Sequence, residues 1–218
     1  MTYKVLKSGE SRSFPASHPF LEAATQGPSL VFIGDDAGQA FREAGDAVDG
    51  APFVAIELGT ECLGVHTGEN AGAEGSRVVG FARFRLGDAE PSGLIELVRQ
   101  PATDPEALSL ARAAFEAAGL RVAVCGDFPG RIVDRLIRPY YNAALRRLDE
   151  KLATADDLDM TLRLGLGYPD GPVALLNRTG LHHHYEVSMR LYETLGDAAY
   201  LPARRAQVAH RRAQGDDR

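Results

Sequence analysis

The stretch Pro129–Pro172, PGRIVDRLIRPYYNAALRRLDEKLATADDLDMTLRLGLGYPDGP, decides the fold of the second half of this chain. Between positions 133 and 148 its apolar residues recur at steps of three and four, the period of one buried helix face. Pro139 interrupts this pattern, and we expect it to bend the helix. A second helix is predicted to begin at Thr154 and to end at Gly165 and Gly167, where glycine tolerates the left-handed C-cap conformation.

A third helical segment is predicted between Pro172 and Leu195, and it contains three consecutive histidines, His182–His184. Consecutive residues on a helix point in different directions, whereas metal ligands must share one face. We therefore interpret the histidines as a helix-surface cluster and expect no metal site. The arginines after Pro202 predict a solvated, partly disordered basic tail over residues 203–218.

Strand and helix patterns alternate in the first half of the chain. Short apolar runs predict strands at Tyr3–Leu6, Leu30–Ile33, Phe53–Ile56, Arg77–Phe84, Leu94–Arg99 and Leu120–Cys125. Helices are predicted at Ala37–Val48 and from Asp104-Pro105 onward, and Lys7–Pro19 is a predicted loop. This alternation favours an α/β domain at residues 1–126, whose sheet has parallel portions, followed by an all-α domain at 127–202.

Composition excludes several classes of protein. The 218 residues carry a net charge of −6, which argues against nucleic acid or an anionic membrane as partner. No apolar run is long enough to span a bilayer, and no signal peptide is recognisable. Cys62 and Cys125 are far apart and outside any CxxC motif, so we expect a reducing, cytoplasmic environment.

The stretch that opens this section closely resembles the start of the C-terminal domain of 3-hydroxyacyl-CoA dehydrogenases. The matching motifs are Pro129-Gly130, Pro139-Tyr140-Tyr141-Asn142, Ala153-Thr154 and Gly165-Leu166-Gly167-Tyr168-Pro169. The resemblance extends over roughly residues 29–202 through Arg77-Val78-Val79-Gly80, Leu94-Ile95-Glu96-Leu97-Val98 and Gly196-Asp197. It implies a truncated Rossmann-like sheet followed by a helical C-terminal domain of this family, which associates into homodimers.

The catalytic pair of the family is broken here. In these dehydrogenases a histidine takes the proton of the substrate 3-hydroxyl while NAD accepts the hydride, and a glutamate orients that histidine. The resemblance places the glutamate at Glu96 and the histidine at Ala82, which is neither an acid nor a base. Glu96 remains the candidate catalytic residue, and we expect it to be solvated or paired with an arginine such as Arg83 or Arg85.

Two further positions are implied to contact substrate. The asparagine that the family places near the substrate carbonyl corresponds to Asp134, and an ionised aspartate can only accept hydrogen bonds. Arg131 replaces a phenylalanine of the family and is a candidate salt-bridge partner of Asp134, although residues three apart on a helix often form only a surface pair. Thr60 is the hydroxyl nearest to the position of the family's serine, and His18 and His66 lie in predicted loops without a visible partner.

Dinucleotide binding requires a G-x-G-x-x-G turn between a first strand and a helix, and this sequence has none. About 23 residues separate the strand at Tyr3–Leu6 from the strand at Leu30, too few for a complete nucleotide-binding half with crossovers of about 30 residues each. We therefore expect this half to be truncated and no cofactor to be bound, although the family uses NAD.

Three hypotheses follow for function. The first is a family member that cannot oxidise 3-hydroxyacyl-CoA with NAD by itself, and that binds acyl-CoA or another small molecule or regulates a partner. The second is a working NAD-dependent dehydrogenase with unusual residues. The third is an enzyme of changed reaction that uses Glu96 or Asp134 as a general base. Under each of them, we expect a homodimer formed through the helical domain.

Overall fold

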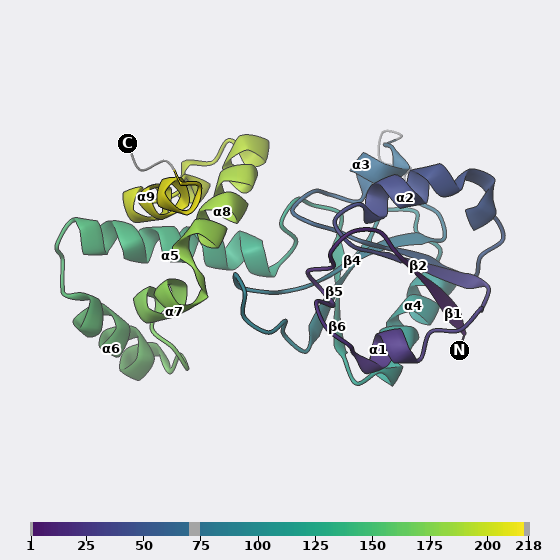
Figure 1. Cartoon of the computed structure of the whole chain (residues 1–218), viewed down its shortest axis with the longest axis horizontal. Coiled ribbons are helices and arrows are strands. Elements are labelled where there is room, and N and C mark those ends of the chain that lie inside the picture. Colours follow the sequence, from purple (N-terminus) through teal and green to yellow (C-terminus); the bar gives the residue numbers. More distant parts are fainter. Residues whose placement is uncertain (1, 70–74, 216–218) are drawn as a thin grey trace. The chain divides into compact units, whose positions relative to one another are not determined.

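The computed structural model describes residues 2–69 and 75–215, which fold into two compact units (Figure 1). Unit 1 comprises Met1–Arg85 and Pro91–Ile132, and unit 2 comprises Leu86–Glu90 and Val133–Arg218. Unit 1 extends to Ile132, and the backbone N–H groups of Gly130 and Ile132 are hydrogen-bonded to other residues of this unit. Within the described residues, no helix is both long and apolar enough to cross a membrane.

Unit 1 contains the predicted α/β sheet, with its strands side by side in chain order. They are β1 (Tyr3–Lys7), β2 (Ser29–Ile33), β3 (Val54–Glu57), β4 (Val78–Arg83), β5 (Leu94–Arg99) and β6 (Arg121–Gly126). The strands β1 to β4 are parallel, β5 runs antiparallel to β4, and β6 is parallel to β5. The carboxyl ends of β1 to β4 consequently meet at one edge.

Both faces of this sheet are covered, which explains the continuous apolar runs of its strands. The helices of unit 1 are α1 (Pro19–Glu22), α2 (Ala37–Ala44) with the following 3₁₀ turn η1 (Gly45–Val48), α3 (Gly64–Thr67) and α4 (Pro105–Ala117). One face packs a cluster of aromatic rings that includes Phe14, Phe20, Phe81 and Phe115, the last from α4. The other face carries a second cluster, to which α2 contributes Phe41.

Unit 2 is helical, as predicted. It contains α5 (Val133–Asp149), α6 (Ala155–Leu166), α7 (Pro172–Thr179), α8 (Leu181–Leu195), the 3₁₀ turn η2 (Ala198–Tyr200) and α9 (Arg204–Ala213). The helix α5 continues through Pro139. The caps of α6 are the predicted ones, because the Thr154 hydroxyl accepts the Asp157 N–H at 3.1 Å and Gly167 is left-handed, with φ of 69°.

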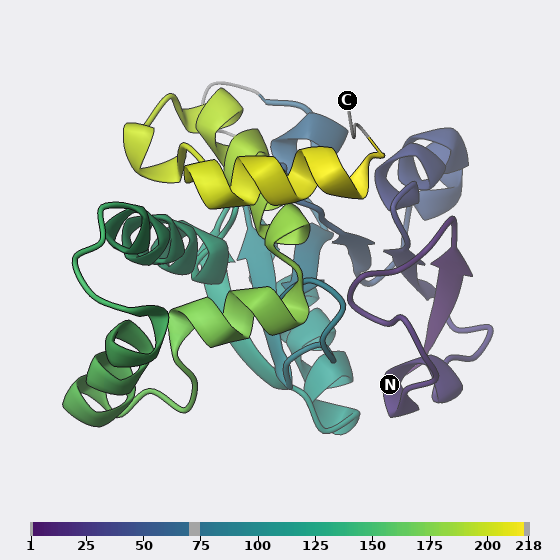
Figure 2. The ribbon, with the colours of Figure 1, turned by 60° about the vertical axis from the view of Figure 1, so that its left-hand side comes forward.

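Two predictions for this unit were wrong. The single helix expected after Pro172 is divided at Gly180, which ends α7. This residue has a φ of 92°, a backbone conformation that favours glycine. The expected disordered tail is instead the helix α9 over residues 204–213, which packs against α8 (Figure 2). Ala206 is buried, and Arg204 and Arg205 both pair with Asp149 of α5. Residues 216–218 of the predicted tail lie outside the described residues.

Candidate functional site

Glu96 lies in the middle of β5, directly opposite Ala82 of the antiparallel strand β4. Its side chain is only 3% exposed, and one carboxylate oxygen accepts the Ile132 N–H at 2.8 Å. The other carboxylate oxygen lies 3.4 Å from Nε of Arg131. Glu96 is therefore a buried carboxylate whose partner is a guanidinium group.

A left-handed turn directs Arg131 toward Glu96. Gly130 and Arg131 have φ values of 73° and 51°, and a non-glycine residue adopts this conformation only when its surroundings hold it there. Nη2 of Arg131 donates to the Gly59 carbonyl at 2.7 Å, and the Gly130 N–H donates to the Thr60 carbonyl at 2.9 Å. Nη1 of Arg131 is buried and has no hydrogen-bond partner among residues 2–69 and 75–215.

The partners of these charged residues differ from the expected ones. Glu96 pairs with Arg131, whereas Arg83 donates to the carbonyl groups of Ser13 and Ser92. Asp134 pairs with Arg138 on the next turn of α5. The structure thus brings together two of the three predicted site residues, Glu96 and Arg131, and gives the third a separate partner.

Gly59 also connects Arg131 with a carboxylate–imidazole pair that the sequence did not indicate. The Gly59 N–H donates to Oε1 of Glu61 at 2.9 Å, and the same oxygen lies 3.4 Å from Nε2 of His66. Burial raises the pKa of Glu61, but hydrogen bonds from His66 and from backbone N–H groups outweigh it and lower this pKa to about 2. Nδ1 of His66 faces the guanidinium of Arg42 at 2.9 Å, so both ring nitrogens are engaged.

The imidazole of His66 packs against Gly38 of α2. A Cβ atom at position 38 would lie 2.1 Å from Cε1 of His66, so the ring packs where only a glycine leaves room. The sequence alone gives no reason to connect positions 38 and 66. Asp127 holds the short helix that carries His66, because its carboxylate accepts the N–H groups of Leu63 and Gly64.

Unit 2 contains a buried polar network between α5 and α8. Nε of Arg138 lies 2.7 Å from Oδ1 of Asp134, and Nη1 of Arg138 faces Nδ1 of His184 at 3.2 Å. Nε2 of His184 lies 2.9 Å from Oδ1 of Asn142. Arg138 and His184 are each 1% exposed. The prediction of a surface cluster was therefore wrong for His184, whereas His183 pairs with Asp88 and its ring lies against that of His182, tilted by 41°.

The network makes stability depend on pH. Burial, reinforced by the positive charge of Arg138, lowers the pKa of His184 from 6.5 to about 3. The unfolded chain binds a proton near pH 6.5 and the native state does not, so stability is lost as the pH falls from 6.5 toward 3, by about 1.4 kcal/mol per pH unit. Urea denaturation of the wild type and of His184→Gln at several pH values measures this slope. The variant should show a weaker loss of stability between pH 6.5 and 4.5, and equal slopes would contradict the assignment.

The carboxyl edge of the parallel strands is crossed by residues 8–15 of the chain itself (the purple segment between β1 and α1 in Figure 1). At the end of β3, the buried carboxylate of Glu57 accepts the Ser11 hydroxyl, the Ser13 N–H and the Gly34 N–H, each at 2.7 Å. At the end of β4, Nη1 of Arg83 donates to the Ser13 carbonyl at 2.9 Å. These contacts hold the segment across the ends of the strands.

This edge differs in two respects from the edge at which open α/β sheets bind dinucleotides. Open α/β sheets bind dinucleotides outside the carboxyl ends of their strands, at a point where the strand order reverses. The order β1-β2-β3-β4 contains no reversal, and residues 8–15 occupy the space outside these ends. A Cβ atom at Gly34 would lie 1.9 Å from the Ser8 carbonyl oxygen, so the segment packs tightly on the turn after β2.

Comparison with known proteins gives one match to a family and several to individual proteins. Residues 130–215 match the family described as 3-hydroxyacyl-CoA dehydrogenase, C-terminal domain. Over 109 residues the chain is 34% identical to the 3-hydroxybutyryl-CoA dehydrogenase of Bradyrhizobium diazoefficiens, a match that covers 50% of this chain and 37% of that protein. It is 28% identical over 158 residues to the 3-hydroxybutyryl-CoA dehydrogenase of Mycobacterium tuberculosis, covering 72% of this chain and 54% of that one.

The fold also matches solved structures. The crystal structure of (S)-3-hydroxybutyryl-CoA dehydrogenase from Ralstonia eutropha superposes with a TM-score of 0.68 and 23% sequence identity, over 91% of this chain and 69% of that one. At this identity the similarity establishes the fold alone. The matched stretches span about half the length, or less, of the two relatives compared by sequence.

Proposed function

Because the chain belongs to the NAD-dependent 3-hydroxyacyl-CoA dehydrogenase family through residues 130–215, we propose that it is a divergent member that does not oxidise 3-hydroxyacyl-CoA by itself. Its function would be to bind an acyl-CoA or a similar small molecule, or to regulate a partner.

The ion pair between Glu96 and Arg131 carries this proposal. By resemblance, the catalytic glutamate of the family orients a histidine at the position of Ala82. Here the carboxylate accepts the Ile132 N–H and faces the guanidinium of Arg131 at 3.4 Å. An imidazole would compete with a permanently charged guanidinium for the same carboxylate.

The same contacts weaken the hypothesis of a changed reaction. Glu96 faces Arg131, and Asp134 lies 2.7 Å from Nε of Arg138. Each carboxylate therefore has an oxygen that faces a guanidinium group and not a substrate. We therefore assign Asp134 to the buried network of unit 2 and not to substrate binding. Nη1 of Arg131, which has no hydrogen-bond partner in the part of the chain that the structure describes, can donate to a carbonyl oxygen, so Arg131 remains our candidate ligand-binding residue.

The proposal predicts a difference between binding and turnover. With acetoacetyl-CoA and NADH, the wild type should show no oxidation of NADH at 340 nm, while acetoacetyl-CoA alone should raise the melting temperature, because a ligand of the native state stabilises it. NAD and NADH should leave the melting temperature unchanged. Turnover by the wild type, or a saturable response to NAD, would instead favour a working dehydrogenase.

Variants of the catalytic pair extend this test. Ala82→His together with Arg131→Met restores the imidazole and removes its competitor for Glu96. We expect the double variant to remain inactive with NADH, because residues 8–15 still cover the edge at which a dinucleotide would bind. Activity in this variant would show that the missing histidine, and not the covered edge, prevents oxidation.

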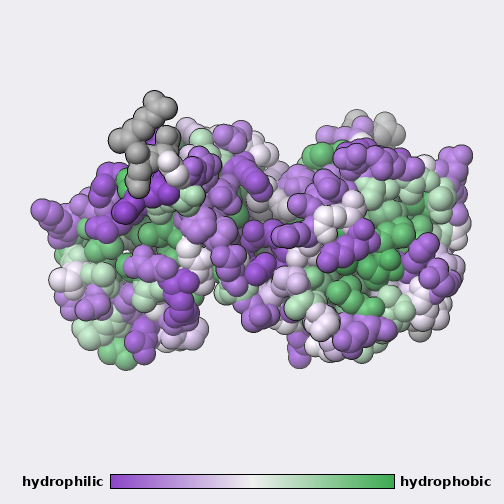
Figure 3. All heavy atoms as spheres, in the orientation of Figure 1, coloured by the Kyte–Doolittle hydropathy of each residue, from purple (hydrophilic) through white to green (hydrophobic). Residues whose placement is uncertain are grey.

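We also propose that the protein forms a homodimer through unit 2. No residue of α6 is buried, and large apolar side chains of this unit are exposed, among them Leu136 at 71%, Leu164 at 79% and Leu166 at 61%. Figure 3 shows hydrophobic residues at the surface in the region where Figure 1 places α6. Apolar residues gathered on a surface favour association.

Light scattering at micromolar concentration tests the homodimer. The wild type should have the mass of a dimer, and Leu164→Glu should have the mass of a monomer because it introduces a charge into the contact. Val65→Glu is the matched control, since Val65 is an equally apolar residue of unit 1 that is 61% exposed. A monomeric wild type would exclude the dimer.

A further inference from the structure

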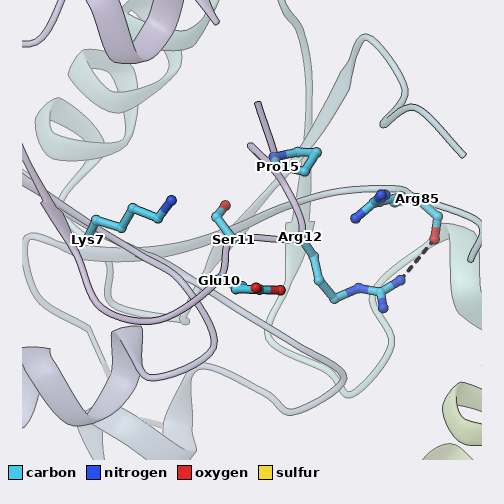
Figure 4. A pocket seen from close by; sticks show the side chains of 6 residues that line it. All are labelled: Lys7, Glu10, Ser11, Arg12, Pro15 and Arg85. Carbon is cyan, nitrogen blue, oxygen red and sulfur yellow. Dashed lines mark hydrogen bonds between the residues drawn. The ribbon is translucent and has the colours of Figure 1, made fainter. Parts of the chain in front are cut away.

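The two edges of the sheet in unit 1 are protected to different degrees. The strands β1 and β6 form these edges, at opposite sides of the sheet (Figure 1). Along β1, the Tyr3 carbonyl accepts the Thr25 N–H at 2.8 Å, and Lys7 places a charge at the end of the strand. The segment that follows β1 is held as well, because Nη2 of Arg12 donates to the Arg85 carbonyl at 3.2 Å beside the pocket shown in Figure 4. Covering segments and charges are the usual protection of an edge strand.

The strand β6 lacks this protection. Its sequence, RVAVCG, carries one charge and no proline. The Arg121 N–H donates to the Gly93 carbonyl at 2.9 Å, so in this parallel ladder Arg121 and every second residue after it turn their backbone groups toward β5. The backbone groups of Val122, Val124 and Gly126 therefore point away from the sheet, and within the described ranges 2–69 and 75–215 they have no hydrogen-bond partner. The outer edge of β6 is thus open to a further strand.

We propose that the outer edge of β6 pairs antiparallel with β6 of a second copy of this chain, so that the two sheets join into one. An antiparallel pair of identical strands has two-fold symmetry, and each copy contributes the same surface. This contact is separate from the one proposed through unit 2. It depends neither on that contact nor on the proposed loss of oxidation.

The hydrogen-bonding groups specify the register of this pairing. In an antiparallel ladder, residues that point toward the partner strand meet in pairs that exchange two hydrogen bonds each. With Val124 opposite Val124 of the second copy, Val122 meets Gly126 of that copy and Gly126 meets its Val122, so all outward groups of β6 are satisfied. A shift by two residues in either direction leaves some of them unpaired, because the Leu120 N–H and the Phe128 carbonyl already bond within the chain.

The same register makes the strand complementary to itself. Continued by one residue, it brings the exposed Arg121 opposite Asp127 of the second copy, and opposite charges across two strands attract. Asp127 already accepts the N–H groups of Leu63 and Gly64, so this attraction requires no new hydrogen bond. The side chain of Val124, which is 38% exposed, packs on its own copy at the two-fold axis. This complementarity of charge and shape is the reason for assigning the edge to a second copy.

The association should be weak. Two paired strands bury much less than the roughly 1,600 Å² of a stable interface, so we expect a dissociation constant above about 10 μM.

Sedimentation equilibrium of the full chain with Leu164→Glu measures the pairing, because this variant removes the contact proposed through unit 2. It should be monomeric at about 1 μM and largely dimeric at about 300 μM. Addition of Val124→Lys should keep it monomeric, since two ammonium groups would meet at the axis. Val124→Thr, which stays neutral and β-branched, is the matched control and should dimerise as before. A monomer at about 300 μM, or equal dimerisation with Val124→Lys, would overturn the proposal.

A proline variant tests the hydrogen bonds themselves. The Val124 N–H points away from β5, so Val124→Pro removes no bond within the sheet, and edge strands tolerate proline at such positions. In the Leu164→Glu background this variant should remain monomeric, with a circular dichroism spectrum like that of its parent. Dimerisation of the folded proline variant would show that the outer edge of β6 is not the contact.

Disulfide cross-linking tests the register. Opposite residues of a hydrogen-bonded antiparallel pair have Cα atoms about 5.5 Å apart, a distance that a disulfide spans. With Cys62→Ser and Cys125→Ser, Val124→Cys should therefore oxidise to a covalent dimer. Val122→Cys is the matched control, because its two copies lie four residues out of register, about 14 Å apart, and it should cross-link about tenfold more slowly or less. Equal rates for the two variants would contradict this pairing.

An extended peptide of another protein is the alternative occupant. The probe is a synthetic peptide of alternating valine and threonine, added to the Leu164→Glu chain. Binding of this peptide in competition with dimerisation supports the edge as the contact. Binding that Val124→Lys abolishes, by a chain that stays monomeric at every concentration, would assign the edge to a different partner and exclude the second copy.

Discussion

Replacing Asp134 by alanine is expected to lower the free energy of unfolding by about 3–5 kcal/mol, because it leaves a buried guanidinium without its carboxylate. Arg138 is 1% exposed, and its Nε lies 2.7 Å from Oδ1 of Asp134. The imidazole of His184 on its other side has a pKa lowered to about 3 and is therefore neutral at pH 7. Urea denaturation followed by circular dichroism measures the loss.

An exposed ion pair of the same type is the control for this prediction. Arg112 and Glu116 of α4 are also four residues apart, with Nε and a carboxylate oxygen at 2.8 Å, but their side chains are 51% and 44% exposed. Glu116→Ala should change the free energy of unfolding by about 0.5 kcal/mol or less. If Asp134→Ala had an equally small effect, the buried network would not contribute to stability as described.

Replacing Arg131 by methionine is expected to lower the free energy of unfolding by about 3 kcal/mol or more, because the buried carboxylate of Glu96 loses its cation. The two side chains are 5% and 3% exposed. The double variant Glu96→Gln with Arg131→Met removes both charges and should recover part of this loss, so a double-mutant cycle in urea should give a coupling energy above about 1 kcal/mol. Additive effects would contradict the ion pair.

These two ion pairs also separate the roles of the candidate residues. Asp134→Ala acts on unit 2 and should leave the response to acetoacetyl-CoA intact at temperatures where the variant is folded. Arg131→Met should abolish this response if Nη1 of Arg131 donates to the ligand carbonyl. A conservative Arg131→Lys variant retains the positive charge but lacks the forked donors of the guanidinium group. It should therefore recover more of the stability lost in Arg131→Met than of the response to acetoacetyl-CoA.

Local chemistry sufficed to predict most of the helices and strands. Asp104 and Pro105 begin α4 because an aspartate N-cap and a proline in the first turn satisfy the helix start. Thr154 and Gly167 bound α6 for the equivalent reasons. The continuous apolar runs of the strands indicated burial on both faces, and both faces are covered.

Local chemistry failed where a distant contact decides the structure. Helix α9 forms from a strongly charged segment because Ala206 packs inward and Asp149 pairs with two arginines. His184 is buried because α5 presents Arg138 and Asn142 to it. The spacing of hydrophobic residues along the sequence predicts none of these contacts, because each contact joins residues more than forty positions apart in the chain.

The amino-acid sequence by itself determined most of the helices and strands, the resemblance of residues 130–215 to a known family, and the presence of alanine at position 82, opposite Glu96. Only the tertiary structure decided that Arg131 pairs with Glu96, that Asp134 pairs with Arg138 and that residues 8–15 cover the carboxyl edge. The reason is physical: capping and periodicity act between near neighbours along the chain, whereas the partner of a charge depends on distances in space that the fold alone establishes.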